Sequence, residues 1–226
     1  MGKLSILNPE TAFKLYESFG LPYEIIKELG GEKASGLTRE NFDEEFKKHQ
    51  EISRAGAEQK FGGHGIVEGD LTAASKEEMW QKTRLHTATH LLFAALKQVL
   101  GKDLKQAGSD ITPERLRFDF TFPRKMTPDE IKQTEDIAND IVDKDLPIAW
   151  KEMELQEALD SGATAFFKLK YPPQVKVYTV GDDKNWFSRE LCGGPHVSHT
   201  GEIGCIKITK EESVSGGNRR IRAIVD

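Results

Sequence analysis

Two pairs of residues with metal-binding side chains stand at a spacing of four. They are His86 with His90 and, about a hundred residues later, Cys192 with His196. In a helix, this spacing places both imidazoles on one face, one turn apart. Glycines and a proline separate Cys192 from His196, and such a turn can direct a thiolate and an imidazole to one point. Nitrogen and sulfur donors suit zinc better than magnesium or calcium, so we expect one Zn²⁺ ion bound by all four residues.

Neighbouring residues leave alternatives for this site. His199 could replace one ligand or lie exposed in a loop, and we favour the loop. Cys205 stands in the apolar pattern GCIKI and is predicted to be a buried strand residue. Thr87, rather than a glutamate, follows His86, so the zinc-peptidase motif lacks its general base. Four protein ligands are typical of structural zinc and three of catalytic zinc, so both roles stay open.

The elements that must position these residues are mixed helices and strands. The strongest helix prediction covers 76–100, which carries both His86 and His90 and ends at Gly101. Other predicted helices cover 9–30 in two parts, a segment opening at Thr38, 127–143 and 154–161. Extended segments are predicted at 116–122, 147–150, 175–180, 203–209 and 219–225. This order predicts an α+β fold: an antiparallel-sheet domain with packed helices at 63–226, preceded by a helical segment at 1–62.

Composition limits the partners that can be expected. The chain has 226 residues, a formal net charge of −5 and two cysteines. Few cysteines and the lack of a signal-peptide pattern predict a cytoplasmic protein, and no apolar run is long enough for a membrane span. Because the net charge is negative, RNA must be bound by a local basic patch. We expect neither DNA nor a membrane as a partner.

Four segments resemble a known family in order and spacing. LHTATHLL (85–92), QAGSDITPERLRFDF (106–120), ELCGGPHVSHTGEIG (190–204) and SVSGGNRRIRAI (213–224) resemble the editing domain of alanyl-tRNA synthetases and the free-standing alanyl-tRNA editing proteins. Segments 12–25 and 42–61 are similar to the part that precedes this domain in the synthetase. We find no segment for ATP-dependent activation of an amino acid, so we expect no aminoacylation activity.

This resemblance implies a proofreading deacylase that hydrolyses Ser-tRNA(Ala) and Gly-tRNA(Ala). A pocket built for alanine cannot strongly exclude serine or glycine, so a second site has to remove the errors. The resemblance implies Zn²⁺ as cofactor, bound by the four residues already named. It also implies Thr89 and Gln106 as catalytic-pocket residues that recognise serine or orient a water. The expected partner is the acceptor end of mischarged tRNA for alanine.

Alternatives to this function also follow from the sequence. Pro195 stands where the alanyl family commonly has threonine, and Gly-Pro-His is similar to the threonyl-tRNA synthetase editing domain, which implies Ser-tRNA(Thr) as substrate. A non-catalytic, zinc-stabilised tRNA-binding module is a further alternative. An unrelated metallohydrolase would need a general base, for which Asp119 is available. For tRNA phosphates we expect contacts from Arg219, Arg220 and Arg117, although the last two could instead pair with Asp119.

Overall fold

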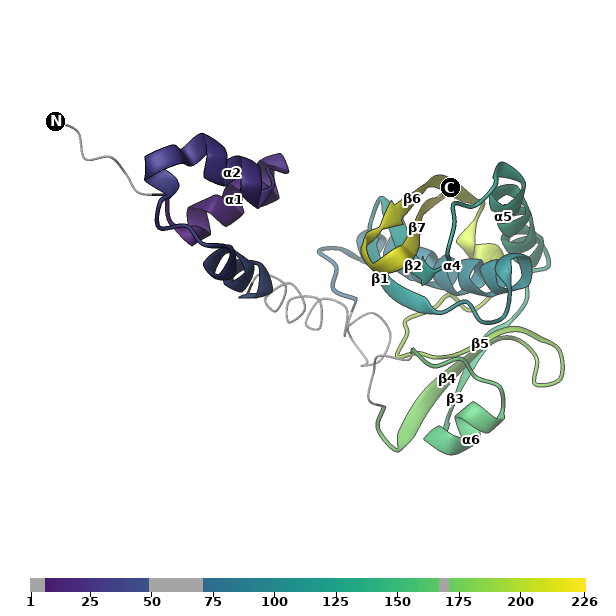
Figure 1. The fold of residues 1–226 in the computed structure, drawn as a ribbon. Helices are drawn as coiled ribbons and strands as arrows, with labels where there is room; N and C mark the ends of the chain where they lie inside the picture. The colour runs from purple at the N-terminus through teal and green to yellow at the C-terminus, as the bar shows by residue number, and fades with distance from the viewer. Residues whose placement is uncertain (1–6, 49–70, 167–170) are drawn as a thin grey trace. The chain divides into compact units, whose positions relative to one another are not determined.

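The computed structural model describes residues 7–48, 71–166 and 171–226 (Figure 1). The chain divides into two compact units, 1–60 and 61–226. The division falls within 49–70, outside the described residues, as does the boundary predicted at residue 62, which stays a prediction. None of the described helices combines the length and the apolar character that a membrane span requires.

The first unit is a small helical bundle. Helix α1 (Pro9–Phe19) begins at Asn8, whose side chain accepts a hydrogen bond from the Thr11 backbone N–H at 2.8 Å. After Gly20 comes α2 (Tyr23–Gly30), then a short 3₁₀ helix Gly31–Ala34 and a helical segment at 39–48. Their shared core consists of Ala12, Phe13, Ile26, Ala34, Leu37 and Phe42. The predicted helices with a turn at Gly20 are therefore confirmed.

The second unit is built on a four-stranded antiparallel sheet in the order β1-β2-β7-β6. Its strands are β1 (Gln106–Thr112), β2 (Arg115–Thr121), β6 (Ile206–Val214) and β7 (Asn218–Val225). The 3₁₀ turn Ser215–Gly217 joins β6 to β7. Helices α4 (Lys76–Leu100) and α5 (Pro128–Asp143) pack on this sheet. Their contact surface is the main hydrophobic core, which contains the fully buried Leu91, Phe118 and Ile221.

Local signals define both helices. The Ser75 side chain caps α4 by accepting from the Glu78 backbone N–H at 3.1 Å. Thr127 and Glu130 form a reciprocal capping box at the start of α5. Because α4 packs against α5 and the sheets, it is buried over most of residues 83–96. Helix α4 is therefore an internal element over this stretch rather than a surface helix.

A second, three-stranded antiparallel sheet has the order β3-β4-β5. Its strands are β3 (Ile148–Glu154), β4 (Gln174–Gly181) and β5 (Trp186–Leu191). Helix α6 (Leu155–Asp160) packs on one face through Ala158, against Val175, Val177 and Leu191. After β5 the chain passes through residues 192–199 and a short 3₁₀ helix, Thr200–Ile203, into β6. This connection carries half of the predicted metal ligands.

The predicted α+β class is confirmed, with two antiparallel sheets and packed helices. Strands β1 and β5 were not predicted, because QAGSDIT and WFSREL lack the alternating apolar pattern of a half-buried strand. The prediction of a buried Cys205 is wrong, since Cys205 is exposed and stands just before β6. Ile206 and Ile208 provide the buried positions of that strand instead.

Candidate metal centre

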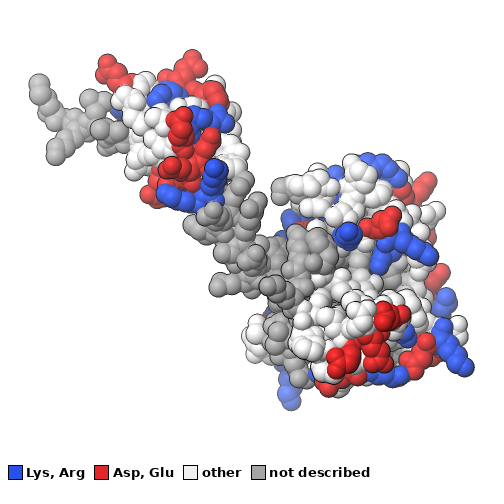
Figure 2. All heavy atoms as spheres, turned by 60° about the horizontal axis from the view of Figure 1, so that its bottom comes forward, with Lys and Arg blue, Asp and Glu red and all other residues white. Residues whose placement is uncertain are grey.

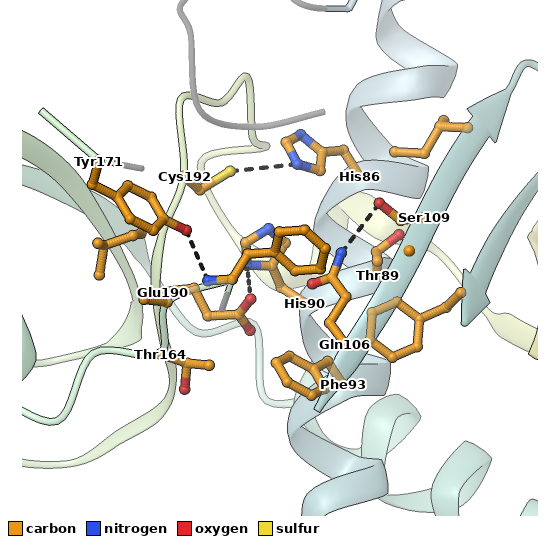
Figure 3. Close-up of a pocket in the computed structure, with 16 residues that line it drawn as sticks. His86, Thr89, His90, Phe93, Gln106, Ser109, Thr164, Tyr171, Glu190 and Cys192 are labelled. Atoms are coloured by element: carbon orange, nitrogen blue, oxygen red, sulfur yellow. Dashed lines mark hydrogen bonds and ion pairs between the residues drawn. The ribbon is translucent and has the colours of Figure 1, made fainter. Parts of the chain in front are cut away.

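The fold brings together the four residues that were predicted as ligands (Figure 3). One candidate ligand atom from each of His86, His90, Cys192 and His196 lies within 4.8 Å of all the others. The Cys192 Sγ lies 3.4 Å from His86 Nε2 and 3.2 Å from His196 Nε2. The first three residues are at most 9% exposed. A polar cluster this deeply buried requires partners, and a shared ion is one way to supply them.

The second ring nitrogen of each histidine has an outer partner. His86 Nδ1 donates to the Pro195 carbonyl at 3.0 Å, and His90 Nδ1 lies 3.2 Å from the Glu190 carboxylate. Both partners are acceptors, so each holds its imidazole with a proton on Nδ1 and leaves Nε2 for a metal. His196 Nδ1 lies 3.2 Å from the Thr87 hydroxyl. All three imidazoles are therefore oriented in the same way.

Thr87 also fixes the loop that carries Cys192 and His196. Its hydroxyl donates to the Thr83 carbonyl at 3.0 Å, so its lone pairs face the loop. There it accepts from the Val197 backbone N–H at 3.2 Å as well as from His196 Nδ1. One fully buried side chain of α4 thus ties this loop to the helix that bears the other two ligands.

Gly194 supplies a conformation that the loop requires. Its φ of +77° lies in the left-handed region, and a Cβ at this position would run into the Tyr178 hydroxyl. The ring of Tyr178 packs against His196, with ring centroids 4.3 Å apart. The glycine allows the loop to pass close to Tyr178 and to bring Cys192 and His196 to one side.

The electrostatics favour the metal-binding form at two of the four residues, Cys192 and His196. At His90, burial opposes protonation, but the charges of Glu190 and Cys192 outweigh it and raise the pKa of His90 well above its ordinary value. Burial disfavours a thiolate at Cys192, but the nearby His86, His196 and His90 outweigh it and hold the pKa of Cys192 well below its ordinary value. Burial, with the neighbouring His86, lowers the pKa of His196 to about 3. A thiolate and a neutral imidazole are the forms that coordinate a metal.

The donor set fits zinc. Imidazole nitrogen and thiolate sulfur are both zinc ligands, and four such donors match the usual tetrahedral coordination of zinc. Ligands bound at about 2.0–2.3 Å to one tetrahedral ion lie about 3.6 Å apart, and the two Sγ–Nε2 distances of 3.4 and 3.2 Å are close to this value. The cluster is therefore consistent with a bound metal ion, and zinc is the ion that its chemistry favours.

A cavity adjoins the cluster, and three elements supply its walls (Figure 3). Helix α4 contributes His86, Thr89, His90 and Phe93, which share one face because they are three and four apart. Strand β1 contributes Gln106 and Ser109, whose side chains form a hydrogen bond of 3.3 Å. The β5 side contributes Thr164, Tyr171, Glu190 and Cys192. Thr89 and Gln106, the predicted pocket residues, therefore both line the cavity beside the cluster.

Two residues that contact the cluster were not predicted from the sequence. Thr87 was noted only for not being a glutamate, and Glu190 was not noted at all. Glu190 is 9% exposed, pairs with His90 and accepts from Ser188 Oγ at 2.8 Å. Its position two residues before Cys192 was a usable signal, because alternate residues of an extended segment point to the same side.

The predicted tRNA-binding arginines lie elsewhere in the unit. Arg220 forms a two-bond ion pair with Asp119, at 2.6 and 2.8 Å, which was the alternative considered for it. Arg219 Nε lies 2.6 Å from Glu211, in a pair whose side chains are 12% and 2% exposed. Arg117 is on β2 beside Asp119, and none of the three arginines is among the described residues that line the cavity. Their contact with tRNA stays a prediction.

Two further predictions concern His199 and the surface charge. His199 is exposed and lies outside the four-residue cluster. On the face drawn in Figure 2, basic and acidic side chains are interspersed rather than gathered into one basic surface. This agrees with the negative net charge, so any RNA contact has to depend on a local feature.

Comparison with known proteins identifies relatives of the chain. Residues 175–222 match the family model described as "Threonyl and Alanyl tRNA synthetase second additional domain". The alanine–tRNA ligase of Treponema denticola is 49% identical over 221 residues, which is 98% of this chain and 34% of the relative. The enzyme of Treponema pallidum is 46% identical, and the match covers 95% of this chain and 33% of the relative. The enzyme of Dehalococcoides mccartyi is 50% identical, and the match covers 70% of this chain and 18% of the relative. The chain spans about a third of the length of the first of these relatives.

The fold, the cluster and the matched segment together define an α+β domain of the type shared by threonyl- and alanyl-tRNA synthetases, with a candidate His₃Cys metal site. Over nearly its whole length, the chain is homologous to the editing-domain region of alanyl-tRNA synthetases. In these relatives the region is part of an enzyme. The resemblance inferred from the motifs is therefore confirmed.

Proposed function

We propose that this chain hydrolyses the ester that links serine or glycine to tRNA for alanine, with Zn²⁺ as cofactor. The observation that carries the proposal is the cavity in which the buried His₃Cys cluster meets hydrogen-bonding side chains of α4 and β1. Homology to the editing-domain region of alanine–tRNA ligases supports the substrate class. On this proposal the chain is a deacylase without aminoacylation activity.

Thr89 and Gln106 would recognise the aminoacyl group. The Thr89 hydroxyl donates to the Leu85 carbonyl at 2.9 Å, so only its lone pairs remain to face the cavity. It can therefore accept a hydrogen bond from a serine hydroxyl, which alanine lacks. The side-chain amide of Gln106 donates a hydrogen bond to Ser109 Oγ. Its carbonyl oxygen can accept a hydrogen bond from the substrate or from an attacking water. A site that bonds a hydroxyl discriminates strongly between serine and alanine. The glycine ester would be hydrolysed without this contact, because glycine has no hydroxyl.

The four ligands would hold the zinc, and Glu190 would orient His90 through its carboxylate. When bound, zinc supplies positive charge beside the ester and polarises it. A second candidate function, a non-catalytic module with a structural zinc, is favoured by the number of ligands, since four protein ligands usually mark a closed site.

Deacylation of Ser-tRNA(Ala) tests the proposal. Hydrolysis should be faster than in buffer, Ala-tRNA(Ala) should be spared, and His90→Ala should abolish the effect. Ser-tRNA(Thr) serves as the substrate for the threonyl alternative. If zinc is bound and tRNA binds but the serine ester persists as long as in buffer, the deacylase proposal is wrong and the structural module is supported.

A further inference from the structure

A groove continues from the metal cavity toward the C-terminal end of α4. It shares Phe93, Thr164 and Glu190 with the cavity. The other lining residues come from the end of α4, from the turn that follows it and from β5, with Gly162 between them. They are Ala94, Lys97, Gln98, Lys102, Trp186, Phe187, Ser188 and Arg189. A chain lying in the groove would therefore have one end at the metal cavity.

The groove is locally basic in an acidic protein. Lys97 Nζ lies 3.2 Å from the Thr164 hydroxyl and 5.0 Å from the centre of the Phe93 ring, and Lys102 is exposed. Neither lysine forms an ion pair with any residue in the described part of the chain. The only carboxylate among the lining residues is Glu190, which already faces His90 and Ser188. Two lysine charges are thus left to attract an anion.

An indole beside these lysines offers a stacking surface. Trp186 is 40% exposed. Arg189 lies over its ring, 5.1 Å from the centroid, and is itself held by the Thr179 hydroxyl and the Ser161 carbonyl at 3.3 and 3.2 Å. The ring also lies against Gly162, where a Cβ would come within 3.5 Å of it. The indole is therefore held in place with much of its surface in solvent.

The other approach to the cavity is less suited to a polyanion. That groove also reaches Cys192 and Tyr171, but it offers Lys176 together with the acidic Glu152. Its nearby exposed indole, Trp150, has Lys176 Nζ 4.4 Å from the ring centroid, much as Trp186 has Arg189 at 5.1 Å, so the charges and not the indoles distinguish the two grooves. One cation against one carboxylate leaves no excess positive charge, so charge complementarity favours the groove at Lys97 and Lys102.

We propose that the groove formed by Lys97, Lys102 and Trp186 binds the single-stranded 3′ end of the aminoacyl-tRNA. The lysines contact its phosphates, and Trp186 stacks on one of its bases. Positive charge along the backbone and an aromatic surface for the bases are the two features that sequence-tolerant binding of single strands requires. This inference rests on the proposed function, because it takes aminoacyl-tRNA as the ligand. It places the main tRNA contact in this groove rather than at the predicted arginines.

Binding of a non-hydrolysable probe tests the groove separately from catalysis. The probe is tRNA for alanine that carries serine through a 3′-amide, and affinity for the full chain is measured over a range of salt concentrations. Lys97→Gln with Lys102→Gln should weaken binding about ten-fold or more at low salt. It should also reduce the slope of log affinity against log salt by roughly 0.7 for each phosphate that a lysine no longer neutralises. The matched control is Lys132→Gln with Lys144→Gln, in and just after α5, which should change neither quantity.

Trp186→Ala should lower affinity by at least about five-fold, whereas Trp186→Tyr should retain most of it. Trp150→Ala is the matched exposed indole and should bind like the wild type. Thermal unfolding and zinc content should be unchanged in every variant used. Loss of binding in Trp150→Ala or Lys176→Gln, with wild-type affinity in the groove variants, would overturn the proposal, as would a wild-type chain that does not bind the probe.

The two proposals fail in different ways. If binding depends on the groove but Ser-tRNA(Ala) is not hydrolysed, the proposed function fails and the groove assignment stands. If the ester is hydrolysed but the groove variants bind the amide probe as tightly as the wild type, only the groove assignment fails.

Discussion

Replacing Thr87 by valine removes one oxygen atom from the support of the metal centre and keeps the shape of the side chain. In the native protein this oxygen accepts from the Val197 backbone N–H and from His196 Nδ1, at 3.2 Å each. Thr87 is fully buried, so water does not replace the lost acceptor. Valine therefore leaves two donors of the loop without their partner.

The expected loss can be estimated from these two donors. A buried donor left without a partner costs about 1–3 kcal/mol, so Thr87→Val, which leaves two, should lower the free energy of unfolding by about 2–6 kcal/mol. Loss of an outer partner of a metal ligand typically weakens metal binding about 10- to 100-fold. The loss of stability and the loss of zinc affinity would both follow from removing one oxygen atom that does not itself bind the metal.

Thr83→Val is the matched control for this change. Thr83 lies one helical turn earlier and is also buried, but its hydroxyl only donates to the Met79 carbonyl at 2.8 Å. We expect a loss below about 1 kcal/mol and unchanged zinc affinity. Urea unfolding and zinc competition against a chromophoric chelator measure the two quantities. Equal zinc affinities for Thr87→Val and Thr83→Val would refute the role assigned to the Thr87 hydroxyl.

Three further predictions concern single side chains. Glu190→Gln removes the carboxylate beside His90 and should therefore weaken zinc binding about 10- to 100-fold. Chelator competition measures this, and a zinc affinity within a factor of about two of the wild type would contradict it. Thr89→Val should reduce kcat/KM for Ser-tRNA(Ala) by about ten-fold or more and affect Gly-tRNA(Ala) much less; equal losses would argue against recognition of the serine hydroxyl. Arg124 and the Thr127 backbone hold the pKa of Glu130 at about 2, below its ordinary 4.5. Because this folded-state value is depressed, the stabilisation is complete above pH 4.5 and lost as the pH falls toward 2. Glu130→Gln keeps the cap through its amide but removes the charge paired with Arg124, so it should cost up to about 1 kcal/mol at neutral pH and nothing in strong acid. A difference that persists in acid urea unfolding would contradict the assignment.

Local signals were strong enough to predict the helices that carry the fold. The caps of α4 and α5 and the stop at Gly101 are set by residues close in sequence, and both helices lie where they were predicted. Strands β1 and β5 could not be found in the same way. Polar residues of these strands, among them Gln106, Ser109 and Glu190, line the cavity, so the apolar alternation that indicates a strand is missing.

The sequence held a signal for Glu190 beside Cys192 and offered a pair between Arg220 and Asp119 as one alternative. It could not decide which outer contacts form, because each joins distant segments. Thr87 meets Val197 across 110 positions, and Arg220 meets Asp119 across 101. Nothing in the local sequence distinguishes an arginine that pairs with a neighbouring strand from one that faces RNA. The basic groove at Lys97 and Trp186 is likewise formed by two elements that lie far apart in the chain.

By itself, the sequence determined the chemical types of the four candidate ligands, the helix that carries two of them and the family to which the chain is related. These properties depend on residue identity and short spacing, which are local. The tertiary structure alone decided that the two pairs meet, that each imidazole presents Nε2 to the centre, and that the cavity opens toward a basic groove. These properties depend on the packing of α4 against β5 and the loop at 192–199, and packing between distant segments leaves no short-range pattern in the sequence.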